Sequence, residues 1–257
     1  MRSRIAYGIA LALSSTLAAG VCLAQDESEL GKRLAALDHL RRGVNTPFEA
    51  IETECQQLLE QFPGAEDQGR IYAQLAHIYA QTGMRRPGDA QRVIDYAQKA
   101  LQKPLDPLLR LRSYTYWGNA HVRSDPSDVM RSFFEGRAAA GAVYLKGLKE
   151  AQQYNIPEVA PERPAFDLLE ALRSPDFERL RDAHYREVKR YQYERDLHMY
   201  RSALQGQLVF FYTRHPYAGS ELRRLATEIL GDAADVEKLM KLIPPHALKD
   251  EAPPKPK

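Results

Sequence analysis

Apolar residues recur at spacings of three and four along most of the chain, and sustained alternation of apolar and polar residues is scarce. Such spacing places apolar side chains on one face of an α-helix. The run from Leu208 to Tyr212 is strand-like in composition, but its place at the end of a long helical pattern favours helix. The expected fold class is all-α. The pattern predicts helices at about 28–41, 47–61, 68–82, 88–102, 107–123, 127–154, 165–173, 175–213, 220–230 and 233–242.

Prolines mark the starts of several of these helices. Thr46, Pro47 and Glu49 form a capping box, with a hydroxyl at the cap, proline at the first helical position and glutamate at the third. The pairing of a capping residue with proline recurs at Asp106-Pro107, Asp125-Pro126 and Ser174-Pro175.

A cluster of prolines divides the chain. Three prolines in the eight residues 157–164 predict an extended link over 155–164. The link separates a helical region at 25–154 from a C-terminal helical region at 165–245. The tail at 246–257 is rich in proline and charge, so we expect it to be disordered.

The N-terminus has the features of an export signal. Arg2 and Arg4 precede an apolar run, and small residues ending at Ala24 give way abruptly to charge. This order predicts a signal peptide at 1–24 that is cleaved after Ala24, and therefore a periplasmic or secreted protein. The alternative is an uncleaved helix that anchors the chain, because residues 5–24 reach the roughly 20 apolar residues that a membrane span needs. Cys22 follows Val21, which fits a lipoprotein signal poorly.

Composition and charge narrow the classes of partner. Apolar residues make up 44% of the chain, enough for a sizeable core. Without Arg2 and Arg4 the chain has 34 basic and 34 acidic side chains, so the mature protein is close to neutral. A neutral chain gives no electrostatic reason to expect nucleic acid or an anionic membrane as a partner.

The mature chain keeps a single cysteine, Cys55, which cannot form an internal disulfide. Cys55 shares a helical face with Ile51 and Leu58, so we expect a small core residue instead of a reactive thiol. The patterns CxxC, CxxCH and HExxH are absent from the sequence. We therefore expect no metal and no cofactor.

Two segments 42 residues apart are similar to each other. Residues 70–79 read RIYAQLAHIY and residues 112–121 read RSYTYWGNAH. In each, a tyrosine is followed three residues later by a large apolar residue and then by a small one. The small residue would let a neighbouring antiparallel helix approach, and the large residues would fill the flanks. The residues predicted to pack in this way are Tyr72, Leu75, Ala76, Tyr79, Ala100, Tyr114, Trp117 and Gly118.

These segments resemble the tetratricopeptide repeat family, in which W/Y-x-x-L-G/A-x-x-Y precedes a helix similar to I-x-Y-Y-x-K-A-L and a turn proline. The second helix of the first unit reads IDYAQKAL at 94–101. The resemblance is good over 68–123 and loose over 124–154. The sequence departs from the motif at an insertion, 84–89, and at His121, where the motif has tyrosine. The resemblance implies antiparallel hairpins stacked as a short α-solenoid. With so few hairpins, the C-terminal helices must help complete the core.

The resemblance also implies a concave face that binds a partner. Guanidinium groups bind carboxylates bidentately, so this face resembles a peptide-carboxylate site. The alternative is that these residues form the ordinary solvated faces of amphipathic helices. The residues expected on this face are Arg70, Ala73, His77 and Gln81 from one unit and Arg112, Thr115, Asn119 and Arg123 from the next.

The long helical segment 175–213 is rich in tyrosine, histidine and charge. Glu194 and His198 lie four residues apart, with His184 farther along, but a metal site needs three or four converging ligands, which one helix cannot supply. We expect the tyrosines to pack their rings inside with their hydroxyls at the rim. The arginines and lysines would form an ion-paired outer surface.

The sequence thus predicts an exported helical-repeat protein that binds another protein or peptide and has no catalytic activity. No nucleophile–base pair or carboxylate pair has a defined spacing. A second hypothesis is a structural component of a cell-envelope assembly that associates through its tyrosine-rich C-terminal helix. An all-α enzyme is the third. The identity of the partner and the oligomeric state do not follow from the sequence.

Overall fold

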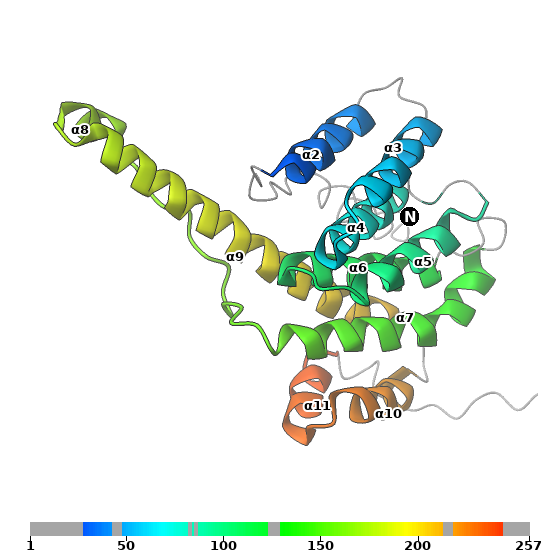
Figure 1. The fold of residues 1–257 in the computed structure, drawn as a ribbon. Coiled ribbons are helices and arrows are strands. Elements are labelled where there is room, and N and C mark those ends of the chain that lie inside the picture. Colours follow the sequence, from blue (N-terminus) through cyan, green and yellow to red (C-terminus); the bar gives the residue numbers. More distant parts are fainter. Residues whose placement is uncertain are drawn as a thin grey trace, which may run out of the picture.

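The computed structural model describes residues 28–42, 48–81, 84, 87–122, 129–212 and 218–243. These residues form helices joined by turns and extended segments, with no strand among them (Figure 1). The fold is all-α, so the prediction from the spacing of apolar residues is confirmed. Within this part of the chain, no helix is long and apolar enough to cross a membrane. The predicted signal peptide, 1–24, and the tail, 246–257, lie outside these residues.

The helices begin and end close to the predicted positions, including the strand-like run 208–212, which is helical. In chain order they are α2 (Glu29–Arg42), α3 (Phe48–Gln61), α4 (Ala65–Gln81), α5 (Asp89–Leu101), α6 (Pro107–Val122), α7 (Val129–Ala151), α8 (Leu168–Arg173), α9 (Phe177–Tyr212), α10 (Ala218–Leu230) and α11 (Ala233–Met240).

Local capping explains two of the starts. The Leu108 N–H donates to Oδ1 of Asp106 at 2.8 Å, and Pro107 occupies the first position of α6. The start of α9 differs from the prediction by two residues, because Ser174 and Pro175 belong to a turn before it. The Leu180 N–H donates to the carbonyl of Asp176 at 3.0 Å, which makes Asp176 the capping residue. Thr46-Pro47 and Asp125-Pro126 lie outside the described residues.

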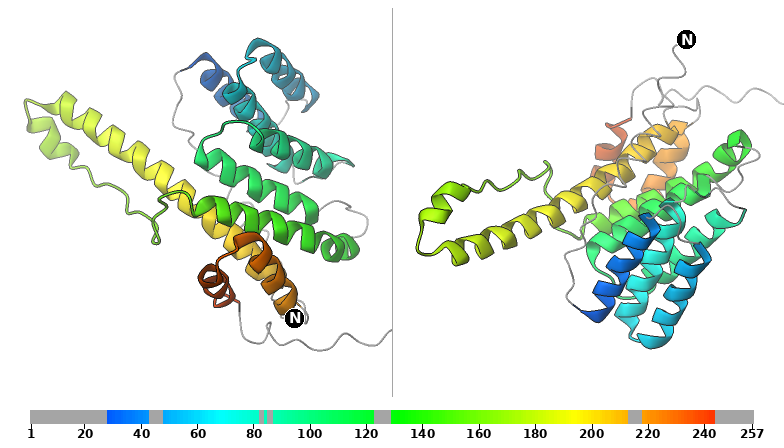
Figure 2. Two further views of the ribbon diagram at one scale, coloured as in Figure 1. Left: turned by 60° about the horizontal axis from the view of Figure 1, so that its bottom comes forward. Right: turned by 90° about the horizontal axis from the view of Figure 1, so that it is seen from above.

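Consecutive helices from α2 to α7 pack side by side. Alternate helices also touch, because α2 lies against α4 and α4 lies against α6. The second half of α9 lies against α6 and α7, and α10 packs on α7 (Figures 1 and 2). We call α2 to α7, the second half of α9, α10 and α11 together the body.

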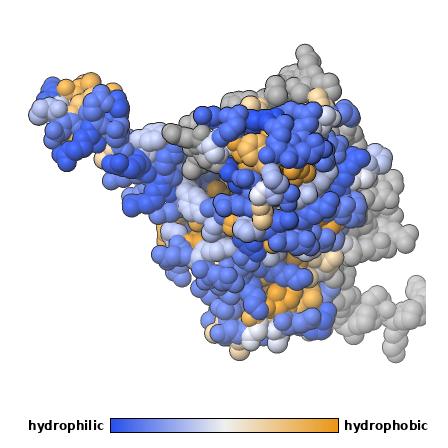
Figure 3. Space-filling model, in the orientation of Figure 1, coloured by the Kyte–Doolittle hydropathy of each residue, from blue (hydrophilic) through white to orange (hydrophobic). Residues whose placement is uncertain are grey.

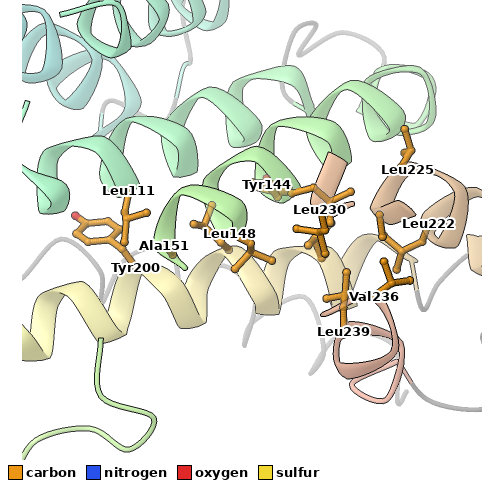
Figure 4. Packing of buried hydrophobic residues seen from close by; sticks show 14 of the residues in the cluster. Leu111, Tyr144, Leu148, Ala151, Tyr200, Leu222, Leu225, Leu230, Val236 and Leu239 are labelled. Atoms are coloured by element: carbon orange, nitrogen blue, oxygen red, sulfur yellow. The ribbon is translucent and has the colours of Figure 1, made fainter. Parts of the chain in front are cut away.

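Two large clusters of buried apolar residues and one small one hold the body together. The first large cluster is built mainly by α2 to α5 and includes Leu34, Leu58 and Val93, with Ala120 of α6 at its edge. The second joins α6 and α7 to the second half of α9, α10 and α11. Figure 4 shows Leu148 and Leu222 among the side chains that converge on this second cluster. The C-terminal helices therefore complete the core of the segment that contains α6 and α7.

Two glycines allow α6 and α7 to approach closely. A Cβ atom at Gly118 would lie 2.2 Å from Cε1 of Tyr144, whose side chain is fully buried. A Cβ atom at Gly136 would lie 1.8 Å from the carbonyl oxygen of His121. Because both distances are far inside van der Waals contact, a larger residue at either position would force the two helices apart.

One part of the chain leaves the body. The first half of α9 projects outward and carries α8 at its far end (Figures 1 and 2). The extended link runs outward from the body along α9, and Nη2 of Arg201 donates to the carbonyl of Pro157 at 2.8 Å. Farther out, the ring of Phe166 stacks on His184 with centroids 4.4 Å apart. We call residues 158–190 the arm, residues 166–180 its tip and residues 181–190 its shaft.

Candidate interaction surfaces

The structure brings two of the predicted binding residues together. His77 is buried, and its Nδ1 lies 2.7 Å from the hydroxyl of Tyr116. Nε2 of Gln81 lies 2.7 Å from Nε2 of His77, and Oδ1 of Asp38 lies 3.6 Å from the same nitrogen. His77 is thus enclosed by polar side chains of three helices, α2, α4 and α6. Such an arrangement orients the ring but leaves little of it for a ligand.

The remaining predicted binding residues are not displayed as an open row. Arg112 is only 2% exposed. Arg70 is half-buried, with Nη1 4.0 Å from Oδ1 of Asp67, and Asn119 accepts a hydrogen bond from the hydroxyl of Tyr144 at 2.7 Å. Ala73 and Thr115 are buried, and Arg123 lies outside the described residues. The peptide-carboxylate site stays a prediction, and in this arrangement Arg112 would reach a ligand only if its surroundings opened.

Arg112 is covered because α9 lies against α6. Tyr200 of α9 is 1% exposed and lies beside Leu111 of α6 (Figure 4). Burial raises the pKa of Tyr200 well above its usual value, and the charge of the nearby Arg112 acts in the opposite direction. Within the described chain, Nε of Arg112 and Oδ2 of Asp196 have no hydrogen-bond partner. Helical periodicity could not have revealed this cover, because it marks the apolar face of a helix and not the helix that packs there.

The residues predicted to pack the repeat are buried or half-buried. Half-buried aromatic side chains stack at the edges of the body, with Tyr72 and Tyr96 centroids 6.3 Å apart and Lys99 over both rings. Leu75, Ala76, Tyr79, Ala100 and Gly118 are buried, and Tyr72, Tyr114 and Trp117 are half-buried.

His121 replaces the tyrosine of the repeat motif and packs against Trp117. The Trp117 indole N–H donates to Nε2 of His121 at 2.9 Å. Burial lowers the pKa of His121, which favours the neutral ring that this hydrogen bond requires. His121 is therefore explained by packing.

The titratable groups of the long helix do not converge. His184 stacks on Phe166, Glu194 lies 3.7 Å from Arg190, and Nε2 of His198 lies 3.2 Å from the carbonyl of Glu158. Across the described ranges, no group of three histidine, cysteine or acidic side chains is placed to hold a metal ion. Cys55 is fully buried, and burial raises its pKa to about 12, so it is an inert thiol in this environment.

The arm carries a surface that sequence reasoning missed. Among the described residues, seven large apolar side chains are exposed, and six of them belong to the arm: Val159, Leu168, Leu169, Leu172, Leu180 and Tyr185. The seventh is Leu242 of the body. At the tip, Leu169 is 69% exposed and Leu172 is 57% exposed. Figure 3 shows apolar side chains at the end of the arm, whose surface is otherwise hydrophilic in this view, and further apolar areas on the body.

Local geometry explains why the tip cannot bury its leucines. α8 has six residues, and Ala171 is its buried residue, against α9. Leu168, Leu169 and Leu172 are each more than half exposed, because α9 is the helix that α8 packs against and it covers mainly the side of Ala171. The sequence carries no signal for this exposure, because Leu168, Leu169 and Leu172 share one helical face, as the leucines of a buried helix do.

Comparison with known proteins finds no family model, no curated protein and no solved structure that matches this chain.

Proposed function

We propose that this chain is an exported helical-repeat protein that binds another protein and performs no chemistry of its own, with the arm as its docking element. The observation that carries this proposal is the gathering of six of the seven exposed large apolar residues on the arm. Exposed apolar side chains that gather on one part of a surface often mark an interaction site, and three of these six lie together on α8.

The way in which the arm is held supports a docking role. α9 is continuous from Phe177 to Tyr212, and its second half inserts Leu204 and Leu208 into the core, where both are fully buried. The link adds a second attachment through Arg201. An element that is anchored so firmly at one end presents its far end in a defined direction, which reduces the entropy lost on binding.

The contacts of the body are consistent with the repeat hypothesis. Each helix from α2 to α7 touches the next, and α4 also touches α2 and α6. Stacked hairpins produce this pattern of neighbours. We infer that the body is a short helical-repeat stack whose inner side is partly filled by α9.

Capture of partners tests the docking role. Tagged wild-type protein, the variant Leu169→Glu/Leu172→Glu and the control Leu242→Glu would each be purified from the native envelope fraction and their bound proteins identified. We expect a partner that is retained by the wild type and by Leu242→Glu and lost by the arm variant. Equal retention by all three would contradict a role for the arm.

Export has a separate test. The intact mass of the protein isolated from its native source should correspond to a chain that begins at Gln25, because cleavage is expected after Ala24. A mass that includes residues 1–24 would favour the anchored alternative.

A further inference from the structure

The arm carries opposite net charges at its two ends. The tip has four acidic side chains, Asp167, Glu170, Asp176 and Glu178, and two basic ones, Arg173 and Arg179. The shaft has the basic side chains Arg181, Arg186, Lys189 and Arg190 and the acidic side chains Asp182 and Glu187. The formal net charge is therefore −2 at the tip and +2 along the shaft.

Some of these charges are paired within the arm and others are not. Arg179 lies 3.0 Å from Asp176, and Arg181 pairs with Glu178 and Asp182. Arg190 lies 3.7 Å from Glu194, which follows the shaft in α9. Glu170 of the tip and Arg186 of the shaft are both exposed, and neither forms an ion pair within the part of the chain that the structure describes. The other charges without an ion pair among the described residues are Asp167 and Arg173 at the tip and Glu187 and Lys189 in the shaft. The unpaired charges therefore sum to −1 at the tip and +1 in the shaft.

Resting on the proposed role of the arm as the docking element, we propose that its partner is the arm of a second copy of this chain, packed antiparallel about a twofold axis with each tip against the other shaft. An antiparallel pairing brings the acidic tip of each copy to the basic shaft of its partner. Because a twofold interface repeats every contact, the contact of tip with shaft is made twice.

The same charges disfavour other arrangements. Two tips placed against each other would bring like charges together, as would two shafts. An anionic membrane surface would repel the acidic tip on which the most exposed leucines lie. The antiparallel pairing is the arrangement of two arms in which both the exposed apolar residues and the net charges are complementary.

The apolar side chains complete the match. The tip presents Leu168, Leu169, Leu172 and Leu180, of which Leu180 is 37% exposed, and the shaft presents Tyr185, which is 55% exposed. From Phe177 to Arg190, α9 rises about 21 Å. Two arms that overlap over this length make an interface near the small end of the usual range, so the dimer is expected to be reversible, with a Kd roughly in the micromolar range.

Sedimentation equilibrium and light scattering at about 1–200 µM protein test this pairing. We expect the wild type to shift from monomer to dimer over this range, and Leu169→Glu/Leu172→Glu to weaken the dimer at least ~100-fold. The control Leu242→Glu should dimerise as the wild type does. Circular dichroism would verify that each variant stays helical.

Charge reversal tests the antiparallel register. Glu170→Lys and Arg186→Glu should each weaken the dimer about 2-fold to 30-fold, because exposed ion pairs are modest and each is made twice. The double variant Glu170→Lys/Arg186→Glu restores opposite charges at tip and shaft, so its Kd should return to within about 3-fold of the wild type. If the Kd of the double variant is raised as much as the two single effects combined, the pairing of tip with shaft is overturned.

The sedimentation and capture experiments together distinguish a second copy as the partner from a different protein as the partner. A wild type that stays monomeric throughout overturns the second copy as partner. If the leucine variant then still loses a captured envelope protein, the arm docks on a different protein and the proposed function stands. If the leucine variant keeps every captured protein and the wild type is monomeric, both proposals fail.

Discussion

The body and the arm are built from the same kinds of residue and use them in opposite ways. In the body, α6 and α7 approach so closely that glycine is required at Gly118 and Gly136. In the arm, α8 devotes four of its six positions to leucine or alanine and buries only Ala171 among them. An apolar residue is buried when its helix has enough neighbours, and α8 has one.

Exposure in the arm therefore follows from its architecture and not from its composition. α9 passes through both settings, with Leu204 and Leu208 fully buried in the body and Leu180 partly exposed at the tip. The same helix thus acts as a core element at one end and as a display element at the other. Substitutions at matched residue types in the two regions should separate the two roles.

Truncating a leucine to alanine is expected to show the largest difference between body and arm in the free energy of unfolding. Leu204→Ala removes a side chain that is fully buried between α6, α7 and α9 and should lower the free energy of unfolding by about 3 kcal/mol. Leu169→Ala, at a residue that is 69% exposed, should change it by less than about 0.5 kcal/mol. Urea denaturation of both variants measures the difference, at a concentration where the wild type is monomeric. Equal losses would mean that the arm is part of the folded core.

Added volume at a glycine should have the next largest effect. Gly118→Ala places a methyl group against the ring of Tyr144, so we expect a loss of about 1–3 kcal/mol. Gly206→Ala is the matched control, because this glycine also lies within a helix and a Cβ atom there meets nothing within 4 Å. Alanine should stabilise that position by about 0.5–1 kcal/mol through helix propensity. Thermal denaturation should show a lower melting temperature for Gly118→Ala and a higher one for Gly206→Ala. A lower melting temperature for both variants would contradict the explanation that α6 and α7 approach too closely for a side chain at Gly118.

Removing an ion pair should change the free energy of unfolding less than the substitutions above. The effect should be larger in the body than in the arm, and in the body it should depend on pH. In the body, Nε of Arg110 lies 2.7 Å from Glu150, and Tyr154 donates to the same carboxylate. Burial alone would raise the pKa of Glu150, but the hydrogen bonds from Arg110 and Tyr154 and the charge of Arg110 outweigh it and hold the pKa below its usual value. The pair therefore stabilises the fold above the unfolded pKa of about 4.3, and this contribution is lost as the pH falls through the lower folded value.

Arg110→Met should thus cost about 1 kcal/mol at pH 7 and less at pH 3. In the arm, Arg179 pairs with Asp176, but the two side chains are 77% and 58% exposed. Arg179→Met should change stability by no more than about 0.3 kcal/mol at either pH. Urea denaturation at both pH values makes the comparison. An effect of Arg110→Met that does not shrink in acid would show that the ion pair is not its source.

Much of the fold could be predicted from the sequence, because apolar spacing and proline caps are local signals. The start of α6 is an example, since Asp106 and Pro107 fix it through a single hydrogen bond and a preset φ angle. What could not be predicted is which helices become neighbours. Arg112 was expected on an open concave face, and the pairing of α6 with α9 buries it. The exposed leucines of α8 were missed for the same reason, because spacing shows an apolar face and not whether anything covers it.

Hydrogen–deuterium exchange at two protein concentrations, about 1 µM and 200 µM, tests the central claim that the arm is a docking element for a second copy. At the lower concentration, amides of α6 and α7 should exchange slowly and those of residues 166–190 quickly, because the arm has few buried contacts. At the higher concentration, we expect added protection to be confined to residues 166–190, and to disappear in Leu169→Glu/Leu172→Glu. Protection that is unchanged by concentration, or that rises in the body instead of the arm, would contradict the account.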